Sequence, residues 1–487
     1  MTDQTEHTCD VVVLGAGPVG ENVADRTAAA GLSTVIVESE LVGGECSYWA
    51  CVPSKALLRP VLLRAEAARM PGVGSLLTGP ADTAAVLAHR DRMVSDRDDS
   101  GQVAWLDSAG VALIRGRGRI DGPRRVTVET DDGEIRLTAR HAVAVCTGSR
   151  AAVPQLPGID SVRIWTSREA TSAGKPPGRL VVVGGGVVAT EMATAWRGLG
   201  SRVTVLVRGE RLLPRLESFA ADLVAERLRE AGVDLRFGVT VRSVERAGGA
   251  GDRVDVTLGD GSHVITDELL FATGRAPRTD DIGLETVGLD PGRWIDTDDS
   301  YTATGVHGEW LYAVGDVNHR ALLTHQGKYQ ARVAGAVIAA RARGEAVDAT
   351  AWGPHAGTAD GVAVPQVVFT DPEIAAVGPT AEQAARAGLE VEAVDYDLGQ
   401  VSGARQYDPG YRGRARMLVD PRRGVLVGAT FAGPGVAELL HSATVAVAGE
   451  VPIDRLWHAV PAFPTISEIW LRLLETLRDE RRAAGTA

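Results

Sequence analysis

A short apolar strand, a glycine-rich turn, a helix and a second strand follow one another at two distant places in this chain. In the first copy, an apolar strand over residues 9–14 enters the turn Gly15-Ala16-Gly17-Pro18-Val19-Gly20. A helical stretch then runs to Ala30, and a strand over residues 34–37 ends in Glu38. This order predicts a βαβ unit that binds a dinucleotide.

Each small or acidic residue of this first copy has a mechanical role. Gly15 makes the tight turn, Gly17 allows the backbone to approach a pyrophosphate, and Gly20 allows the helix to pack closely on the strand. Glu38 accepts a hydrogen bond from a ribose hydroxyl. The flanking strands and the helix turn a common glycine pattern into a specific prediction.

The second copy has a strand over residues 180–183, the turn Gly184-Gly185-Gly186-Val187-Val188-Ala189, a helix through Arg197 and a strand over residues 203–207. Ala189 takes the place of the third glycine, which the pattern allows. The second strand is followed by Arg208 rather than by an acid.

The residue after that strand indicates which nicotinamide cofactor binds. With Arg208 at this position, no carboxylate is available there to accept from a ribose hydroxyl. The positive charges of Arg208 and of the nearby Arg211 and Arg215 suit a 2′-phosphate instead. We therefore predict NADPH rather than NADH. The alternative is that these arginines are ordinary surface residues.

Two cysteines indicate the chemistry. Cys46 and Cys51 lie in residues 43–55, shortly after the first fingerprint. Five residues of regular helix rise about 7.5 Å, more than the Cα separation of up to about 6.8 Å that a disulfide tolerates. A bridge therefore needs irregular backbone, and a strained bridge is readily reduced. We predict a redox-active dithiol against a flavin; the alternative is two buried apolar thiols.

Length and composition favour a cytoplasmic enzyme of about three domains. The chain has 487 residues, four cysteines, and 51 basic against 63 acidic residues, so 51 − 63 gives a net charge of −12. Neither secretion nor a disulfide framework is expected, and no stretch of about 20 apolar residues predicts a membrane span. Nucleic acid is an unexpected partner for such a charge. No histidine and cysteine cluster has the spacing of metal ligands, so no metal site is predicted.

Three further segments end in small or acidic residues. Residues 142–145 form a strand before Thr147 and Gly148, and residues 269–272 form one before Gly274. A third apolar strand is closed by Gly315-Asp316. After about residue 355, shorter segments at 365–369, 415–419 and 424–431 predict antiparallel strands followed by helices, which is a separate α+β domain.

Taken together, these motifs resemble the flavoprotein pyridine nucleotide-disulfide oxidoreductases, the family of dihydrolipoamide dehydrogenase, glutathione reductase and mercuric reductase. The resemblance covers nearly the whole chain and includes Phe369-Thr370-Asp371-Pro372-Glu373, which resembles the start of the family's dimer-forming domain. It implies FAD contacts from Gly15, Gly17, Gly20, Glu38, Gly44, Lys55, Thr147, Gly148, Gly315 and Asp316. It implies NAD(P) contacts from Gly184, Gly186, Ala189, Glu191, Arg208 and Gly274.

The resemblance also implies a fold and a homodimer. The fold is α/β, with two Rossmann-like dinucleotide-binding domains and a C-terminal α+β dimerisation domain. Residues 1–150 and 278–352 would bind FAD, residues 151–277 would bind NAD(P), and residues 360–487 would form the dimer.

By the same resemblance, Cys51 is the thiol beside the flavin and Cys46 is the interchange thiol that meets the substrate. Lys55 matches the lysine near the flavin N5, and Glu191 matches its carboxylate partner. A nearby cation favours the thiolate and the reduced flavin, and pairing with a carboxylate offsets the cost of burying that cation.

The chain departs from the family near its C-terminus. Disulfide-reducing relatives have a histidine, supplied by the partner subunit, where this chain has Phe463, although the accompanying Glu468 is present. A positioned acid/base group contributes roughly 10²–10⁴ in rate, so efficient turnover of lipoamide or glutathione disulfide is not assumed. His458 is a possible substitute, but a role on a helix surface is the stronger interpretation. Tyr48-Trp49-Ala50 replaces the usual Asn-Val-Gly and either changes access to Cys46 or packs under the flavin domain.

These observations leave the oxidising substrate open. The first hypothesis is hydride transfer from NAD(P)H through flavin to the Cys46-Cys51 disulfide and on to a disulfide-type or other small acceptor. The alternatives are a quinone or oxidant reductase that bypasses the dithiol, an enzyme similar to 2-ketopropyl-coenzyme M oxidoreductase/carboxylase, which also carries phenylalanine, and a redox sensor with decayed catalysis. No cysteine follows Cys146, which argues against a mercuric reductase or a large thioredoxin reductase.

Overall fold

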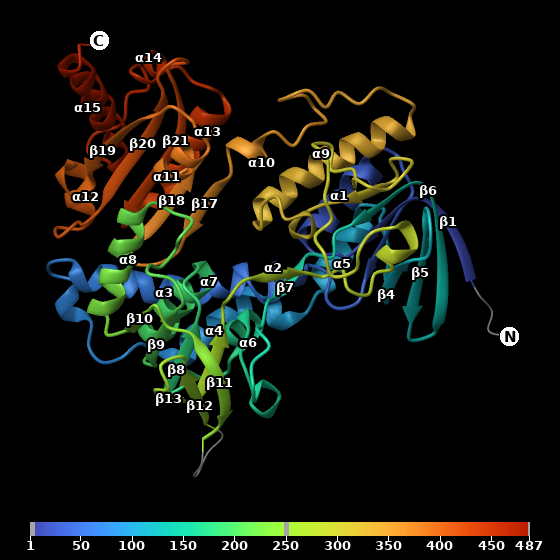
Figure 1. Cartoon of the computed structure of the whole chain (residues 1–487), viewed down its shortest axis with the longest axis horizontal. Helices are drawn as coiled ribbons and strands as arrows, with labels where there is room; N and C mark the ends of the chain where they lie inside the picture. The colour runs from blue at the N-terminus through green and yellow to red at the C-terminus, as the bar shows by residue number, and fades with distance from the viewer. Residues whose placement is uncertain (1–4, 248–252, 486–487) are drawn as a thin grey trace. The chain divides into compact units, whose positions relative to one another are not determined.

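The computed structural model describes residues 5–247 and 253–485 and divides into two compact units (Figure 1). Unit 1 contains residues up to Pro53 together with Asp91–Ala152 and Arg275–Gly361, and unit 2 contains Ser54–Arg90, Val153–Gly274 and the residues from Val362. The predicted α/β class is confirmed. The division into three functional domains stays a prediction.

Unit 1 is built on one mixed sheet. Its strand order is β3-β2-β1-β6-β5-β4, and β16 also pairs with β6. The pairs β1-β2, β2-β3, β1-β6 and β6-β16 are parallel, whereas β4-β5 and β5-β6 are antiparallel. The strands are β1 (Thr5–Leu14), β2 (Thr34–Glu38), β3 (Ala112–Arg115), β4 (Arg117–Ile120), β5 (Arg125–Thr130), β6 (Gly133–Val145) and β16 (Leu311–Ala313), with the separate pair β7 (Ser149–Ala151) and β15 (Arg275–Pro277).

Helix α1 packs against α9 in unit 1 (Figure 1). Glycines permit the close approach, because a Cβ on Gly327 would lie 2.5 Å from Val19 and one on Gly335 would lie 2.6 Å from Arg26. Pro18 begins α1, where its missing N–H costs nothing. The helices of this unit are α1 (Pro18–Ala29), α2 (Gly44–Tyr48), α5 (Ser100–Ser108) and α9 (Thr324–Ala342), and three others cross the unit boundaries: α3 (Cys51–Arg69), α4 (Thr83–Met93) and α10 (Ala359–Val362).

Unit 2 contains a parallel sheet of order β10-β9-β8-β14 and an antiparallel sheet of order β11-β12-β13. Trp196 is fully buried in the cluster of apolar side chains that covers the parallel sheet. The strands are β8 (Arg179–Val183), β9 (Arg202–Val207), β10 (Asp234–Phe237), β11 (Val241–Arg246), β12 (Val254–Leu258), β13 (His263–Thr266) and β14 (Glu268–Phe271). The helices are α6 (Ser167–Ser172), α7 (Val187–Gly198) and α8 (Ser218–Glu230).

The C-terminal part of unit 2 is an antiparallel sheet of order β17-β18-β21-β20-β19, as the strand-length segments predict. Helices α13 and α15 pack on it (Figure 1). The strands are β17 (Pro365–Val368), β18 (Glu373–Val377), β19 (Glu392–Asp397), β20 (Arg414–Asp420) and β21 (Val425–Gly433). The helices are α11 (Ala381–Arg386), α12 (Ser402–Tyr407), α13 (Leu440–Ala448), α14 (Ile453–Leu456) and α15 (Ile469–Ala483).

A search of the described residues finds no helix with the length and apolar character needed to cross a bilayer.

Candidate active site

The two cysteines lie on either side of a break between two helices. Cys46 is inside α2, Cys51 begins α3, and Trp49 between them has a φ of −135°. This is the irregular backbone that a bridge between these positions requires. Both cysteines are thiols in this structure. The hydroxyl of Thr324, the first residue of α9, lies 3.1 Å from Cys46 Sγ and 3.4 Å from Cys51 Sγ.

Thr324 therefore bridges the dithiol, and sequence reasoning missed it. The pKa of Cys46 is raised, first by its hydrogen bond with Cys51 and then by burial. The Thr324 hydrogen bond and the charge of Lys328 act in the opposite direction. The net effect favours the protonated Cys46 thiol, and two groups of α9, Thr324 and Lys328, act in favour of its thiolate.

The aromatic pair in the redox loop includes a core residue. Tyr48 is buried and its hydroxyl is hydrogen-bonded to Gln102 of α5. Trp49 contacts the Tyr48 ring edge to face, with centroids 5.7 Å apart. The two alternatives for this aromatic pair are a change in access to Cys46 and packing within the domain. For Tyr48, the structure supports packing.

Lys55 and Glu191 form an ion pair within unit 2. Lys55 Nζ lies 2.8 Å from Glu191 Oε2, and the backbone N–H of Phe369 donates to Glu191 Oε1 over 3.0 Å. Lys55 Nζ also lies 5.0 Å from the centroid of the Phe369 ring. Glu191 is 3% exposed, so these contacts offset the cost of burying its charge. Lys55 lies one helical turn after Cys51 on α3.

The loop between β1 and α1 has the geometry of a phosphate cradle. Gly15 has a φ of +97°, and a Cβ there would lie 2.6 Å from the Cys146 carbonyl oxygen. A Cβ on Gly20 would lie 1.8 Å from the Gly15 carbonyl oxygen, whereas a Cβ on Gly17 would meet nothing within 4 Å. Gly44, at the start of α2, approaches Gly17 closely. The open space over Gly17 fits a bound pyrophosphate at the start of α1.

Polar groups around this loop also fit FAD. Glu38 ends β2, and its carboxylate accepts from the N–H groups of Ala16 at 2.7 Å and Glu40 at 2.8 Å. Thr147 Oγ1 is buried and has no hydrogen-bond partner among the described residues, and Gly148 follows it with a φ of +70°. A buried hydroxyl without a partner is rare unless a ligand satisfies it.

Asp316 is a partly buried carboxyl group beside β16. Burial raises its pKa, and the Ser149 hydroxyl donates to it, which acts against that shift. Ser149 also accepts from Arg275 Nε over 2.7 Å. The Asp316 carboxylate therefore requires hydrogen-bond donors, and the hydroxyl groups of a ribityl chain would supply them.

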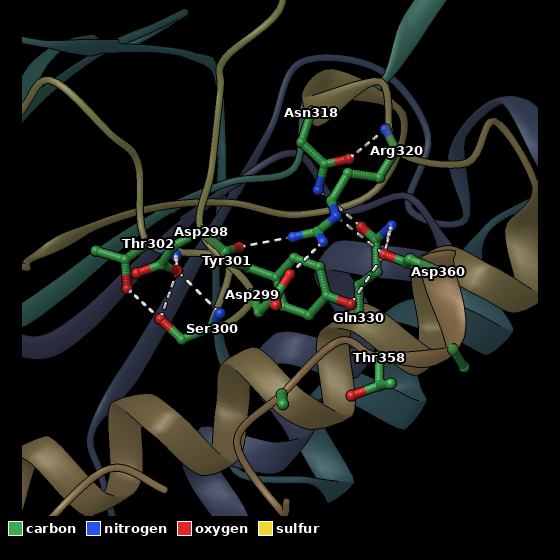
Figure 2. A network of polar contacts seen from close by, with 12 residues as sticks. Asp298, Asp299, Ser300, Tyr301, Thr302, Asn318, Arg320, Gln330, Thr358 and Asp360 are labelled. Carbon is green, nitrogen blue, oxygen red and sulfur yellow. Dashed lines mark hydrogen bonds and ion pairs between the residues drawn. The ribbon is translucent and has the colours of Figure 1, made fainter. Parts of the chain in front are cut away.

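Gly315, just before Asp316, is held by a hydrogen-bond network that reaches α10 (Figure 2). The side chain of Gln330 accepts from Gly315 N over 2.7 Å and from Asn318 Nδ2 over 2.9 Å. Its Nε2 then donates to Asp360 Oδ2 over 2.9 Å.

Asp360 is the centre of this network. The Tyr301 hydroxyl also donates to Asp360 over 2.9 Å, and Arg320 Nε lies 3.6 Å from it (Figure 2). Gln326 Nε2 donates to Asp360 as well, over 2.6 Å. Burial raises the pKa of Asp360, and these donors oppose the shift. Asp360, near the C-terminal end of unit 1, holds the Gln330 amide, and that amide in turn holds the backbone of Gly315. The Gln330 side chain therefore links Asp360 to the Gly315-Asp316 turn. No local sequence signal identified Gln330 or Asp360.

The second fingerprint in unit 2 has the same turn. Gly184 has a φ of +131°, and a Cβ there would lie 2.3 Å from the Ala272 carbonyl oxygen. Gly186 and Gly274 have open space where a Cβ would be, and Ala189 is fully buried in α7.

The arginines after β9 differ from one another in their surroundings. Arg208 is exposed, as is Arg215. Arg211 lies 3.1 Å from Glu382 of α11. Of the three predicted phosphate ligands, Arg211 is therefore already engaged by an acid.

Phe463 lies on the surface of the protomer, where 74% of it is exposed. Glu468 is buried, and its Oε1 accepts from Arg472 Nη2 over 2.5 Å, while its Oε2 is buried without a hydrogen-bond partner among the described residues. His458 is exposed. Thus the carboxylate that resembles the histidine partner of relatives is bound by an arginine one turn later.

The sequence matches one family in two segments. Residues 9–341 match the pyridine nucleotide-disulphide oxidoreductases, and residues 364–473 match the dimerisation domain of the same family.

Curated relatives are similar over nearly their whole length. A dihydrolipoyl dehydrogenase of Halobacterium salinarum is 32% identical over 480 residues, covering 96% of this chain and 95% of the relative. Dihydrolipoyl dehydrogenase 3 of Pseudomonas aeruginosa is 32% identical over 468 residues, covering 94% of this chain and 96% of the relative.

Solved structures agree with this assignment. LpdA from Mycobacterium tuberculosis has a TM-score of 0.82 at 28% identity, covering 97% of this chain and 99% of that one. The HOCl-induced flavoprotein disulfide reductase RclA from Escherichia coli shares the fold, with a TM-score of 0.80 at 23% identity. That comparison covers 96% of this chain and 99% of the RclA chain. Because the family match spans residues 9–341 and continues over 364–473, this chain belongs to the pyridine nucleotide-disulphide oxidoreductases, flavoenzymes that use FAD and a pyridine nucleotide in reactions of sulfur groups.

Proposed function

We propose that this enzyme passes electrons from NADPH through FAD to the Cys46-Cys51 pair and then to a small disulfide-type acceptor. The observation that carries the proposal is the break between α2 and α3, which leaves both thiols within reach of one hydroxyl, that of Thr324. A structural pair of apolar cysteines has no need of such a group. The division into FAD, NAD(P) and dimerisation domains, a homodimer and a cytoplasmic location are part of this proposal.

The proposed roles follow the surroundings of each residue. Bound FAD supplies the hydride-accepting group between the nicotinamide and the dithiol. Gly15, Gly17, Gly20, Glu38, Gly44, Thr147, Gly148, Gly315 and Asp316 would hold FAD, and Gly184, Gly186, Ala189, Arg208 and Gly274 would hold NADPH. The Lys55-Glu191 pair would keep a positive charge beside the flavin, because the buried Glu191 carboxylate holds the Lys55 ammonium group at 2.8 Å.

The exchange step balances on the dithiol itself. The Cys46 thiolate attacks one sulfur of R–S–S–R, a Cys46–S–R bond forms, and RS⁻ leaves and takes up a proton. The Cys51 thiolate then attacks Cys46 Sγ, which forms the Cys46–Cys51 bond and releases the second RS⁻. Two electrons pass from the dithiol to the acceptor, and two thiols result.

The experiment is anaerobic reduction by NADPH followed by a panel of disulfides and quinones, with wild type and Cys46→Ser. The proposal expects NADPH to open the disulfide and Cys46→Ser to abolish disulfide turnover. Quinone reduction that survives Cys46→Ser, with no disulfide turned over by wild type, would instead support flavin-to-quinone transfer that bypasses the dithiol. No NADPH oxidation with any acceptor would favour a redox sensor.

A further inference from the structure

The first two turns of α9 carry two different polar groups, Thr324, which contacts the dithiol, and Lys328. Thr324 donates to Cys46 Sγ over 3.1 Å. Lys328 follows one turn later, so its Cα lies about 6 Å further along the helix axis. Long side chains on a helix lean toward its N-terminus, which for Lys328 is the direction of Thr324. Among the described residues, no carboxylate lies within ion-pair distance of Lys328.

A partly buried acid on the neighbouring helix belongs to the same cluster. Glu21 is in the first turn of α1, which packs against α9. Its Oε1 is buried and has no hydrogen-bond partner among the described residues. Burial raises the pKa of Glu21 to about 7, with the Lys328 charge opposing the shift and Glu38 adding to it. Lys328 therefore acts electrostatically on both Glu21 and Cys46.

The other groups that act on Cys46 bring no further positive charge to it. Cys51 raises the pKa of Cys46 through a hydrogen bond and through its charge, and Thr324 is a neutral hydrogen-bonding partner. Glu45, which precedes Cys46 in α2, is bound by Arg278 Nη2 at 2.8 Å, so that arginine is already paired with an acid.

We propose that Lys328 stabilises the Cys46 thiolate from within the same chain, with Glu21 as its buried counter-charge. This rests on the proposed role of Cys46 as the thiol that meets the acceptor. Phe463 offers no charge for that purpose. Lys328 is a positioning residue here, because it acts on the sulfur through its field and not through the acceptor.

The test is the pH dependence of Cys46 alkylation in the FAD-loaded enzyme. Dithiothreitol opens the pair, iodoacetamide labels the thiols, and fragmentation mass spectrometry assigns the label to Cys46. The expected result is that Lys328→Met moves the midpoint for Cys46 up by about one pH unit, which is a tenfold loss of thiolate at a fixed pH below it. Lys328→Arg restores the midpoint. Glu21→Gln moves it down, because it removes the negative charge that offsets Lys328.

Arg332→Met is the matched control. It removes one positive charge from the next turn of α9, where Arg332 stacks on Tyr329, and it leaves the midpoint unchanged. Equal shifts in Arg332→Met and Lys328→Met, or no shift in Lys328→Met with FAD retained, would overturn the proposal. If Lys328→Met loses FAD, an unshifted midpoint in both Lys328→Gln and Glu21→Gln overturns it. Because dithiothreitol supplies the electrons, failure of NADPH to open the pair counts against the proposed function alone.

Discussion

The two glycine fingerprints share a backbone and differ in what surrounds it. Gly15 and Gly184 both take a positive φ against the carbonyl of a neighbouring strand end, and Gly17 and Gly186 both leave open space. At the end of the second strand, however, Glu38 accepts from the backbone N–H groups of Ala16, in the glycine loop, and of Glu40, whereas Arg208 is exposed. The backbone therefore explains that each loop accepts a pyrophosphate, and the strand ends indicate which nucleotide it carries.

The third small residue and its successor separate the copies further. The Gly15 carbonyl excludes a Cβ at Gly20, whereas at the matching position of the second copy the Cβ of Ala189 is accommodated in a fully buried site. After them, Thr190 satisfies its hydroxyl on the carbonyls of Gly186 and Val187, whereas Glu21 keeps one buried oxygen without a partner. The first copy thus contains a carboxyl oxygen, Glu21 Oε1, that the fold itself does not satisfy. Such a departure from the rule that buried polar groups are paired is expected at functional sites.

The largest expected effect comes from filling the open space in each loop. Gly17 has φ −72° and Gly186 φ −87°, so valine is allowed at both positions. Gly17→Val should give a folded but colourless protein, because the side chain occupies the pyrophosphate position. Gly186→Val should stay yellow and lose NADPH binding by more than about 100-fold. Flavin absorbance and NADPH titration measure the two losses separately.

Gly20→Ala is the contrasting variant for that experiment. Its Cβ would meet backbone 1.8 Å away, so the cost falls on folding, at about 3 kcal/mol or more. A Gly17→Val protein that keeps FAD, or a Gly20→Ala protein as stable as wild type, would contradict the assignment of these loops.

The arginines after β9 give the next largest effect. Arg208→Glu should lower the preference for NADPH over NADH by about 10–100-fold, because a charge-assisted hydrogen bond contributes roughly 1.5–3 kcal/mol. Arg211→Gln should change the preference little, since Arg211 is paired with Glu382. The ratio of kcat/KM for the two cofactors is the measurement. A wild type that uses NADH at least as well removes the basis for the NADPH prediction.

Local patterns predicted the fingerprints but not their long-range partners. The strands β2, β8 and β9 begin and end within two residues of the predicted bounds, and the helices α1 and α7 end within one residue of their predicted ends. β6 starts at Gly133 rather than at residue 142, because its first half pairs with β5 and only its second half follows the apolar pattern.

The site shows the same limit. Lys55 and Glu191 are 136 residues apart, and only the resemblance linked them. Thr324, Gln330 and Asp360 carry no local signal, because a hydroxyl, an amide or a carboxylate in a helix becomes informative only when its tertiary partner is known.

Glu21 provides a test that depends on pH. An acid whose pKa is raised from 4.5 to about 7 favours folding when it is protonated, so that stabilisation is complete below pH 4.5 and is lost as the pH rises through 7. Glu21→Gln stays neutral. Relative to wild type, it should gain up to about 3 kcal/mol between pH 4.5 and 8. The difference in melting temperature between the two proteins, measured at both pH values, reports this gain. A constant difference would mean that folding does not shift the pKa of Glu21.

Among the single substitutions, the smallest expected effect concerns Phe463, whose neighbouring acid Glu468 contrasts with Glu191. Glu191 is satisfied by Lys55 and a backbone N–H, whereas Glu468 has one oxygen on Arg472 and one without a partner. Phe463→His should therefore raise the rate of transfer to an external disulfide by less than about tenfold, because Arg472 already holds the carboxylate that would orient the new ring. Phe463→His with Arg472→Gln should raise it more, toward the roughly 10²–10⁴ that a positioned acid/base group contributes.

Stopped-flow measurement of both half-reactions separates proton supply from electron supply in these variants. The rate of flavin reduction by NADPH should be the same in wild type, Phe463→His and the double variant, because none of these changes touches the nicotinamide fingerprint. Arg472→Gln alone is the control, and it should leave disulfide reduction slow. Fast wild-type reduction of a simple disulfide, unchanged by either histidine variant, would show that proton supply at position 463 does not limit the exchange, and the proposed charge effect of Lys328 on Cys46 would then be the first to test.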